Sequence, residues 1–550
     1  MFTFPLFSQN MYVEINLNEA RENPFSPAKR TLEILRVIDK AANDSGVRGL
    51  VLNIGSFPGS RTDLWEIRSA VEKFKSGGKK VCAVITSADI DTYCLASAAD
   101  KIVMDELGTL NITGYTVGRG YIKNFLEKLG IGVRELRYFQ YKSASEMYTR
   151  NSMSAADSSQ LNDYLDDIFN NTRDALKAAR SLSDSQFNAV INRDFLYSAK
   201  EAQAKGLVDY VGGTEAVKMA IRETEGESIW NFRLYGDPET SLMGDNSSYK
   251  PSNPGGLFIK SPIIAVIYAE GQTDMERGMN IFALSKIIRE QADRISVKAI
   301  VIRIDSPGGS ANAADYFAEA VRYAKSKKPV VVSMGDVAAS GGYWAAMNAN
   351  HIAASPYTIT GSIGVIGSWF YDNGLNAKIG MSLDRLSRGE HADLYTGFLF
   401  PYRDLTAQEE ARYKSYILDL YNIFIVKAAA GRSMEPEKIE IAAQGRVFSG
   451  KRALEAGLID SIGGLDNAVR TARELAGIPE SRKARYEEFP RPKFFAKLFR
   501  SLLMSSGIAH NKADSTFVFF ADKLLNNTDI RYRLEKNGQV MPILPLDFSF

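Results

Sequence analysis

An internal repeat constrains this chain most, because its second copy follows the first at a constant separation of 250 residues. Val47 to Ser60 reads VRGLVLNIGSFPGS and aligns without a gap with VKAIVIRIDSPGGS, Val297 to Ser310 (297 − 47 = 250). The same shift aligns YCLASAADKI, from Tyr93, with YWAAMNANHI, from Tyr343, and the register holds for more than eighty residues. At 550 residues the chain exceeds what one hydrophobic core usually supports. We therefore expect two domains of one fold.

Each copy alternates patterns typical of strands and of helices. In the second copy the strand pattern SPIIAVIYAEG is followed by a helix and then by the strand pattern AIVIRIDSPGGS, which ends in a Gly/Ser turn. The helical pattern ANAADYFAEAVRYAKSKK and the short apolar strand PVVVSMG come next, and a charge-rich helix is expected within Leu405 to Gly431. Both copies close on similar text, SAKEAQAKGLVDYVGG from Ser198 and SGKRALEAGLIDSIGG from Ser449, which predicts a helix capped by Gly, a strand and a Gly-Gly turn. Strands alternating with helices favour βαβ units around a largely parallel sheet. The predicted fold class is α/β, with two tandem domains.

Composition shifts predict the domain boundaries. We expect a first copy over 10–235, a linker rich in Gly, Pro, Ser and Asn over 236–256, a second copy over 257–480, and a C-terminal extension over 481–550. Within the extension, RPKFFAKLFRSLLMSSGIAH has the spacing of a basic amphipathic helix. That helix would either lie at a membrane surface or pack on its own domain.

Charge and residue counts exclude several classes of function. Lys and Arg number 67 against 65 Asp and Glu, so no basic footprint for nucleic acid is present and no nucleic-acid partner is expected. Three histidines are too few for a His-rich metal site, and we expect neither a metal nor a cofactor. Cys82 and Cys94 are expected as small core residues, with a single disulfide between them as the alternative.

Hydropathy gives no transmembrane helix. The sequence has no run of about 18 consecutive apolar residues, and its start, MFTFPLFSQN, lacks the basic region and the apolar length of a signal peptide. We therefore expect either a soluble chain or one whose membrane anchor precedes the sequence given.

The two copies differ in a complementary way at residues that could do chemistry. At Ser340, within MGDVAASGGYW, the first copy has Ile90, and at Lys142, within YKSASEMY, the second copy has Ala392. A site that needs both a serine and a lysine must therefore draw on both copies.

Ser340 follows a predicted strand and a small-residue turn, and it precedes a predicted helix. This position presents a hydroxyl at the carboxyl edge of a sheet; alternatively, the serine only caps the helix. The glycine turn at the end of the preceding strand favours a site, because N–H groups of Gly308 or Gly309, with that of Gly341, could form an oxyanion hole. In the first copy Pro58 replaces Gly308, and proline has no N–H to donate.

A serine hydroxyl is a weak nucleophile and needs a base. His351 is rejected, because eleven residues along one helix place it roughly 16 Å from the serine. His391 remains an alternative. Lys142 is favoured and would serve if burial lowered its pKa, although a single lysine is more often a surface charge.

These motifs together resemble one family over roughly residues 10–480. GDVAASGGYW with the downstream ITGSIGVIG, the SPGGS turn, and YKSA in the first copy are similar to the long form of the SppA signal peptide peptidases, also called protease IV. The resemblance implies tandem ClpP/crotonase-like domains and a serine peptidase. It assigns Ser340 as nucleophile, Lys142 as general base and Ser362, in TGSIG, as a residue that holds the lysine.

The resemblance also implies partners and a location. We expect cleaved signal peptides as substrates, a homo-oligomer such as a tetramer, and attachment to the bacterial inner membrane on its periplasmic side. Long-form members usually carry an N-terminal transmembrane helix, and this sequence begins without one. Two alternatives remain: a crotonase-like acyl-CoA enzyme, and an inactive scaffold of the same fold.

Overall fold

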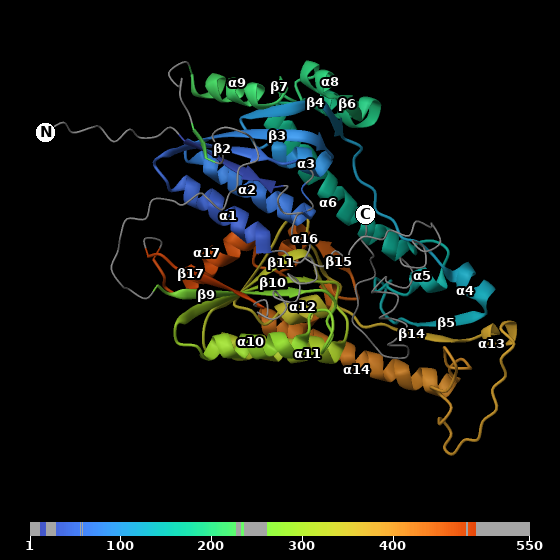
Figure 1. Cartoon of the computed structure of the whole chain (residues 1–550). Coiled ribbons are helices and arrows are strands. Elements are labelled where there is room, and N and C mark those ends of the chain that lie inside the picture. Colours follow the sequence, from blue (N-terminus) through green and yellow to red (C-terminus); the bar gives the residue numbers. More distant parts are fainter. Residues whose placement is uncertain are drawn as a thin grey trace, which may run out of the picture.

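Two β-sheets, one from each copy, form the framework of the computed structural model, and helices pack against them (Figure 1). The structure describes residues 11–17, 29–55, 57, 59–226, 233–235, 261–479 and 482–490. The expected linker at 236–256, the expected basic helix at 491–510 and Pro58 lie outside the described residues.

The first sheet has the strand order β6-β4-β3-β2-β1-β8, and β7 also pairs with β4. Its strands are parallel except β6, which runs antiparallel to β4. The strands are β1 (Met11–Asn16), β2 (Val47–Asn53), β3 (Lys80–Ala88), β4 (Lys101–Asn111), β6 (Leu196–Ser198), β7 (Tyr210–Val211) and β8 (Arg233–Tyr235).

The second sheet repeats this order as β15-β13-β11-β10-β9-β17, with β12 joining β11 to β16. Its strands are β9 (Ile263–Glu270), β10 (Val297–Ser306), β11 (Val330–Ala339), β12 (His351–Ala354), β13 (Ile359–Gly361), β15 (Val447–Ser449), β16 (Ser461–Ile462) and β17 (Arg485–Phe489). Where the first copy has the single strand β4, the second copy has two short strands, β12 and β13. The repeated order of mainly parallel strands confirms the predicted α/β class.

The helices follow the predicted pattern in both copies. They are α1 (Lys29–Ala42), α2 (Arg61–Ser76), α3 (Ile90–Ala96), α4 (Lys123–Leu129), α5 (Glu146–Thr149), α6 (Ala155–Arg180), α7 (Asp184–Ala189), α8 (Ala199–Ala204), α9 (Thr214–Glu225), α10 (Ile281–Asp293), α11 (Ala311–Lys325), α12 (Gly341–Ala346), α13 (Leu375–Lys378), α14 (Ala407–Arg432), α15 (Pro436–Ala442), α16 (Gly450–Glu455) and α17 (Leu465–Leu475). Helix α11 and the charged helix α14 lie where the sequence predicts them, and the predicted glycine after α16, Gly457, has a φ of 72°.

The copies stack head to tail, with α1 and α2 of the first copy between the two sheets (Figure 1). Leu32 and Leu35 of α1 are buried in one cluster with β9, β10 and α17 of the second copy. Glu66 of α2 forms a buried ion pair with Arg303 of β10, at 2.5 Å. This stacking brings the face of the first copy that carries α1 and α2 against the face of the second copy that carries α17.

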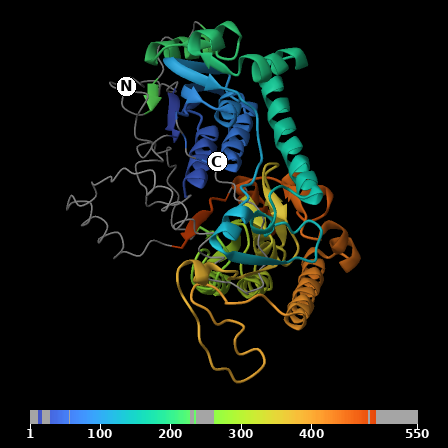
Figure 2. The ribbon, with the colours of Figure 1, turned by 90° about the vertical axis from the view of Figure 1, so that its right-hand side faces the viewer.

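A third, two-stranded sheet joins the copies directly. β5 (Ile131–Leu136) of the first copy pairs antiparallel with β14 (Gly367–Asp372) of the second. Phe139, just after β5, stacks on Tyr421 of α14 with ring centroids 3.9 Å apart. Figure 2 shows the long helix α6 reaching from the first copy to the second, where it contacts β15. The segment after β5, which carries Lys142, is therefore held against the second copy.

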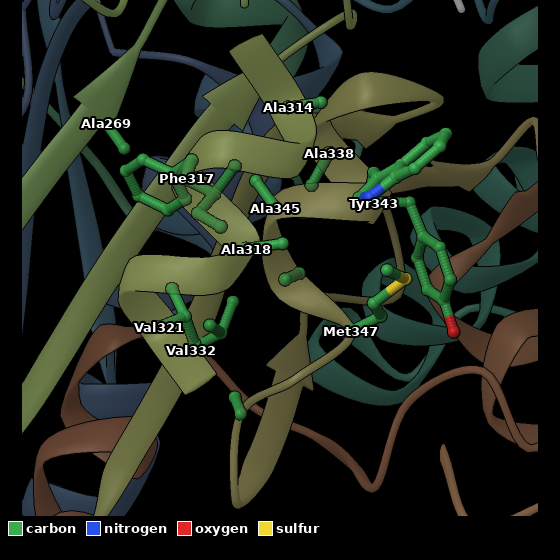
Figure 3. Close-up of a cluster of buried hydrophobic side chains, with 14 of the residues drawn as sticks. Ala269, Ala314, Phe317, Ala318, Val321, Val332, Ala338, Tyr343, Ala345 and Met347 are labelled. Carbon is green, nitrogen blue, oxygen red and sulfur yellow. The ribbon is translucent and has the colours of Figure 1, made fainter. Parts of the chain in front are cut away.

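Small side chains bring the helices of the second copy close to its sheet. Figure 3 shows Ala314 and Ala318 of α11, Ala345 of α12 and Ala338 of β11 in one buried cluster around Phe317. Because alanine side chains are small, the helices can pack closely on the sheet.

The structure describes both cysteines. Cys82 and Cys94 are buried free thiols, so the disulfide alternative is wrong, and burial raises the pKa of Cys82 to about 12 and that of Cys94 to about 11. In the part of the chain that the structure describes, none of the helices combines the length and apolarity needed to cross a bilayer.

Candidate active site

Ser340 occupies a strained turn between a strand and a helix. Its backbone has φ 56° and ψ −115°, a conformation that residues other than glycine rarely adopt. Its N–H donates to the carbonyl of Gly361 at 2.8 Å, and its carbonyl accepts from the N–H of Trp344 at 2.9 Å. Ser340 is the N-cap residue of α12, but its hydroxyl makes no capping bond to the helix.

The strand before this serine is longer than expected. β11 continues through Val337, Ala338 and Ala339 because these residues pair with β13. The sequence instead predicted a short strand followed by a small-residue turn. The continuous strand anchors Ser340 to the sheet on its N-terminal side.

Lys142 of the first copy lies against Ser340 of the second. Its Nζ is 2.7 Å from Ser340 Oγ, 2.8 Å from the carbonyl oxygen of Ser362 and 2.9 Å from Ser362 Oγ. The side chains of all three residues are fully buried. The structure therefore brings together the serine and the lysine that the repeat distributes between its copies, and Ser362 with them.

Burial lowers the pKa of Lys142 well below its usual range, which favours the neutral amine. A neutral amine has two hydrogens to donate and one lone pair. The two oxygens of Ser362 can accept both hydrogens, which leaves the lone pair for the hydroxyl of Ser340. The arrangement can therefore take a proton from Ser340.

A second left-handed turn holds Ser362. Its φ is 51°, and its N–H donates to the carbonyl of Arg446 at 2.7 Å. Next to Arg446, Gly445 packs on the lysine: a β-carbon at Gly445 would lie 2.5 Å from Lys142 Cβ. Sequence reasoning missed this glycine.

The predicted glycines of the oxyanion hole also meet beside Ser340. A β-carbon at Gly341 would lie 3.2 Å from both Gly308 Cα and Gly309 N, so the turn and the start of α12 are in direct contact. The N–H of Gly308 donates to Ser306 Oγ at 3.3 Å, which makes Gly309 and Gly341 the better pair of donors. Thr273, which sequence reasoning also missed, fixes the turn: its N–H donates to the carbonyl of Gly308 at 2.8 Å.

The two histidines within the described ranges, His391 and His351, are hydrogen-bonded to other residues than these. His391 is half exposed, and its Nδ1 is 2.9 Å from Glu409 Oε1. α12 ends at Ala346 and His351 begins β12, so the expected single helix from Ser340 to His351 is wrong. His351 Nε2 is 2.8 Å from Ser461 Oγ. In the described ranges, no group of three or more His, Cys, Asp or Glu residues is arranged to hold a metal ion.

Sequence similarity to known proteins identifies the family of this chain. The model of Peptidase family S49 matches residues 73–226 and 322–479, one segment in each copy. The chain is 31% identical over 510 residues to the serine protease SPPA, chloroplastic, of Arabidopsis thaliana, with 90% of this chain and 72% of that protein covered. It is 34% identical over 478 residues to Protease 4 of Salmonella typhi, with 83% and 74% covered.

A third relative is a putative signal peptide peptidase SppA of Enterococcus faecium, 28% identical over 263 residues, with 45% of this chain and 75% of that protein covered. A family match in each copy, together with the repeated sheets, confirms the expected α/β class with two copies in tandem. Because the family model covers more than half of the chain and two relatives above 30% identity are matched over most of their length, this chain belongs to peptidase family S49 and is a serine peptidase.

Proposed function

We propose that this peptidase works through a dyad of Ser340 and Lys142, one residue from each copy. The observation that carries the proposal is the 2.7 Å contact between a buried lysine amine and a buried serine hydroxyl. Neutral Lys142 takes the proton as Ser340 Oγ attacks the peptide carbonyl, and it then returns the proton to the leaving amine. Ser362 holds the amine through two oxygens. The copies, over 10–235 and 257–480, thus act as one catalytic unit.

The developing negative charge needs donors that are already in place. We assign this role to the backbone N–H groups of Gly309 and Gly341, which lie side by side next to the nucleophile. Gly308 provides the left-handed turn, with φ 103°, that presents them.

We propose apolar peptides, such as signal peptides after their cleavage, as the substrates. The motif resemblance and the name of the Enterococcus faecium relative, a putative signal peptide peptidase, support this choice. The surroundings of the serine also support it, because buried Ala339, Tyr357 and Ile359 belong to one apolar cluster next to it.

A peptidase assay on the full chain tests the proposal. Wild type should cleave an internally quenched apolar peptide, and Ser340→Ala should not, while an acyl-CoA thioester should remain intact. Cleavage retained by Ser340→Ala would exclude this serine as the nucleophile. An intact peptide with wild type would favour the inactive scaffold, and thioester hydrolysis would favour the acyl-CoA enzyme.

We also propose that the peptidase forms a homo-oligomer, a tetramer being one such form. Phe282 of α10 and Tyr316 of α11 make an edge-on ring contact, at 5.5 Å, while 50% and 42% exposed. Leu32, the residue 250 positions before Phe282, is 3% exposed because it packs on the second copy. The outer face of the second copy thus matches in position a face that the first copy buries, which supports contact with another subunit.

We propose a membrane-associated location, on the periplasmic side of a bacterial inner membrane. The proposed substrates, which are left in membranes, support it. The segment 491–510, outside the described residues, supports it through its amphipathic sequence. Fractionation of cells that express the protein, followed by protease accessibility in spheroplasts, tests the location: a soluble or cytoplasmic protein would contradict it.

A further inference from the structure

The segment that carries Lys142 is held by a buried polar network that the catalytic steps do not use. Arg119 Nη1 donates to the carbonyl of Ser143 at 2.8 Å, and Arg119 Nη2 pairs with Asp157 of α6 at 3.1 Å. The hydroxyl of Ser143 donates to Asp157 Oδ1 at 2.5 Å. The side chains of Arg119 and Asp157 are 3% and 0% exposed, so this ion pair is removed from water.

Gln160, one turn further along α6, extends the network to the other side of the lysine. Its Nε2 donates to the carbonyl of Tyr141 at 3.2 Å and to Asp157 Oδ1 at 3.0 Å. Its Oε1 accepts from the N–H of Val447, in the second copy, at 3.0 Å. The backbone carbonyl of Arg446, the residue before Val447, accepts a hydrogen bond from the N–H of Ser362. Hydrogen bonds and the chain therefore connect α6 of the first copy to the serine that holds the lysine.

We propose that Arg119, Asp157 and Gln160 are positioning residues for Lys142. They bind the backbone carbonyls of Tyr141 and Ser143, on either side of the lysine, and so fix the backbone from which the Lys142 side chain extends. Gln160 also binds Val447, in the segment that contacts Ser362. The inference rests on the proposed role of Lys142 as base. A displacement of about 1 Å of such a group can cost about 10²-fold in rate.

The network should also exclude water from the amine of Lys142. Burial removes the amine from water and lowers the pKa of Lys142, which favours its neutral form. A loosened segment would admit water, water would stabilise the ammonium form, and the pKa of Lys142 would rise. A positioning role therefore predicts a displaced pH profile, which a loss of stability alone would not produce.

The second copy supplies an internal comparison. Its helix α14 begins like α6, with Glu409 in place of Asp157 (409 − 157 = 252), each after a Thr or Ser cap. Glu409 pairs with His391 and Arg403, and so braces the loop in which Ala392 replaces the lysine. This brace has the same place in the fold but surrounds no base. Glu409→Gln is therefore a matched control for changes in the first network.

The test measures how fast a serine-directed phosphonate modifies Ser340 in the full chain between pH 6 and 10.5, together with kcat and KM on an apolar peptide. Gln160→Leu preserves side-chain size and net charge but removes the four hydrogen bonds of the amide, to Tyr141, Ser143, Asp157 and Val447. We expect its modification rate and kcat to fall by about 10²-fold at neutral pH. We expect the rising limb to move to higher pH and KM to change little. Glu409→Gln should behave as wild type.

Arg119→Lys is the second variant, and it carries the test if Gln160→Leu does not fold. It keeps the charge beside Asp157 but loses the fork that also holds Ser143, so a smaller change in the same direction is expected. Wild-type rates and an unmoved limb in the folded variants would overturn the inference. If the phosphonate instead left wild-type Ser340 unmodified, or modified Lys142→Met at the wild-type rate, the proposed dyad itself would be overturned.

Discussion

At the scale of single residues, the site depends on unusual backbone conformations held by hydrogen bonds. Ser340 and Ser362 both have positive φ values, and such conformations cost about 1–3 kcal/mol each. Each serine is fixed by an N–H that donates to a carbonyl of a neighbouring segment, Gly361 or Arg446. These strained conformations place the hydroxyls of both serines next to the amine of Lys142.

Ser340→Ala and Lys142→Ala should each lower kcat by at least about 10³-fold while the fold persists, because the two residues act as one unit. The double variant should be no slower than the slower single variant. Peptide turnover, with circular dichroism as the check on folding, measures this. Additive losses in the double variant would mean that the residues act independently.

Replacing the buried lysine should stabilise the protein in a pH-dependent way. Lys142 has a lowered pKa in the folded state and about 10.4 in the unfolded state, so the unfolded chain binds the extra proton between these values. Wild-type stability therefore gains about 1.4 kcal/mol per pH unit from this group as pH rises through that window. Denaturant unfolding of Lys142→Met should show an advantage over wild type that shrinks toward pH 10. A pH-independent difference would contradict a neutral buried lysine.

At the scale of elements, the sequence predicted those helices and strands that depend on local sequence patterns. The βα units, α11, α14 and the closing motif follow from periodicity and caps, and the complementary loss of Ser and Lys predicted which two residues meet. The pairing of β5 with β14 and the bond from Gln160 to Val447 join residues more than 230 positions apart. No local spacing encodes such contacts, so Thr273, Gly445 and the network behind Lys142 stayed unpredicted.

Gly445 offers a test of how tightly the segments around the lysine are packed. Gly445→Ala should cost at least about 2 kcal/mol and lower kcat, because φ is 79° and the new methyl group would meet the backbone of Lys142. Gly206→Ala, at φ 70° with open space around it, is the control and should cost about 1 kcal/mol without loss of activity. Equal effects of the two changes on kcat would contradict the packing argument.

At the scale of the whole molecule, head-to-tail stacking completes one site and leaves one face uncovered. If Phe282 on that face contacts another subunit, Phe282→Glu should reduce the mass measured by light scattering after gel filtration, since a buried charge would destabilise the contact. Leu107→Glu, a change at a residue already 91% exposed, should leave the mass unaltered. An unchanged mass for Phe282→Glu would place the contact elsewhere.

The most direct test of the split dyad is mass-spectrometric measurement of phosphonate modification at Ser340, in the full chain, as a function of pH. For wild type the rate should rise with pH through a single ionisation below about 10.4, the value of a free lysine. Lys142→Met should remain folded and show almost no modification at any pH. Rapid modification of Ser340 in Lys142→Met, or a wild-type limb near 6.5 that disappears in His391→Ala, would contradict a serine activated by the lysine of the other copy.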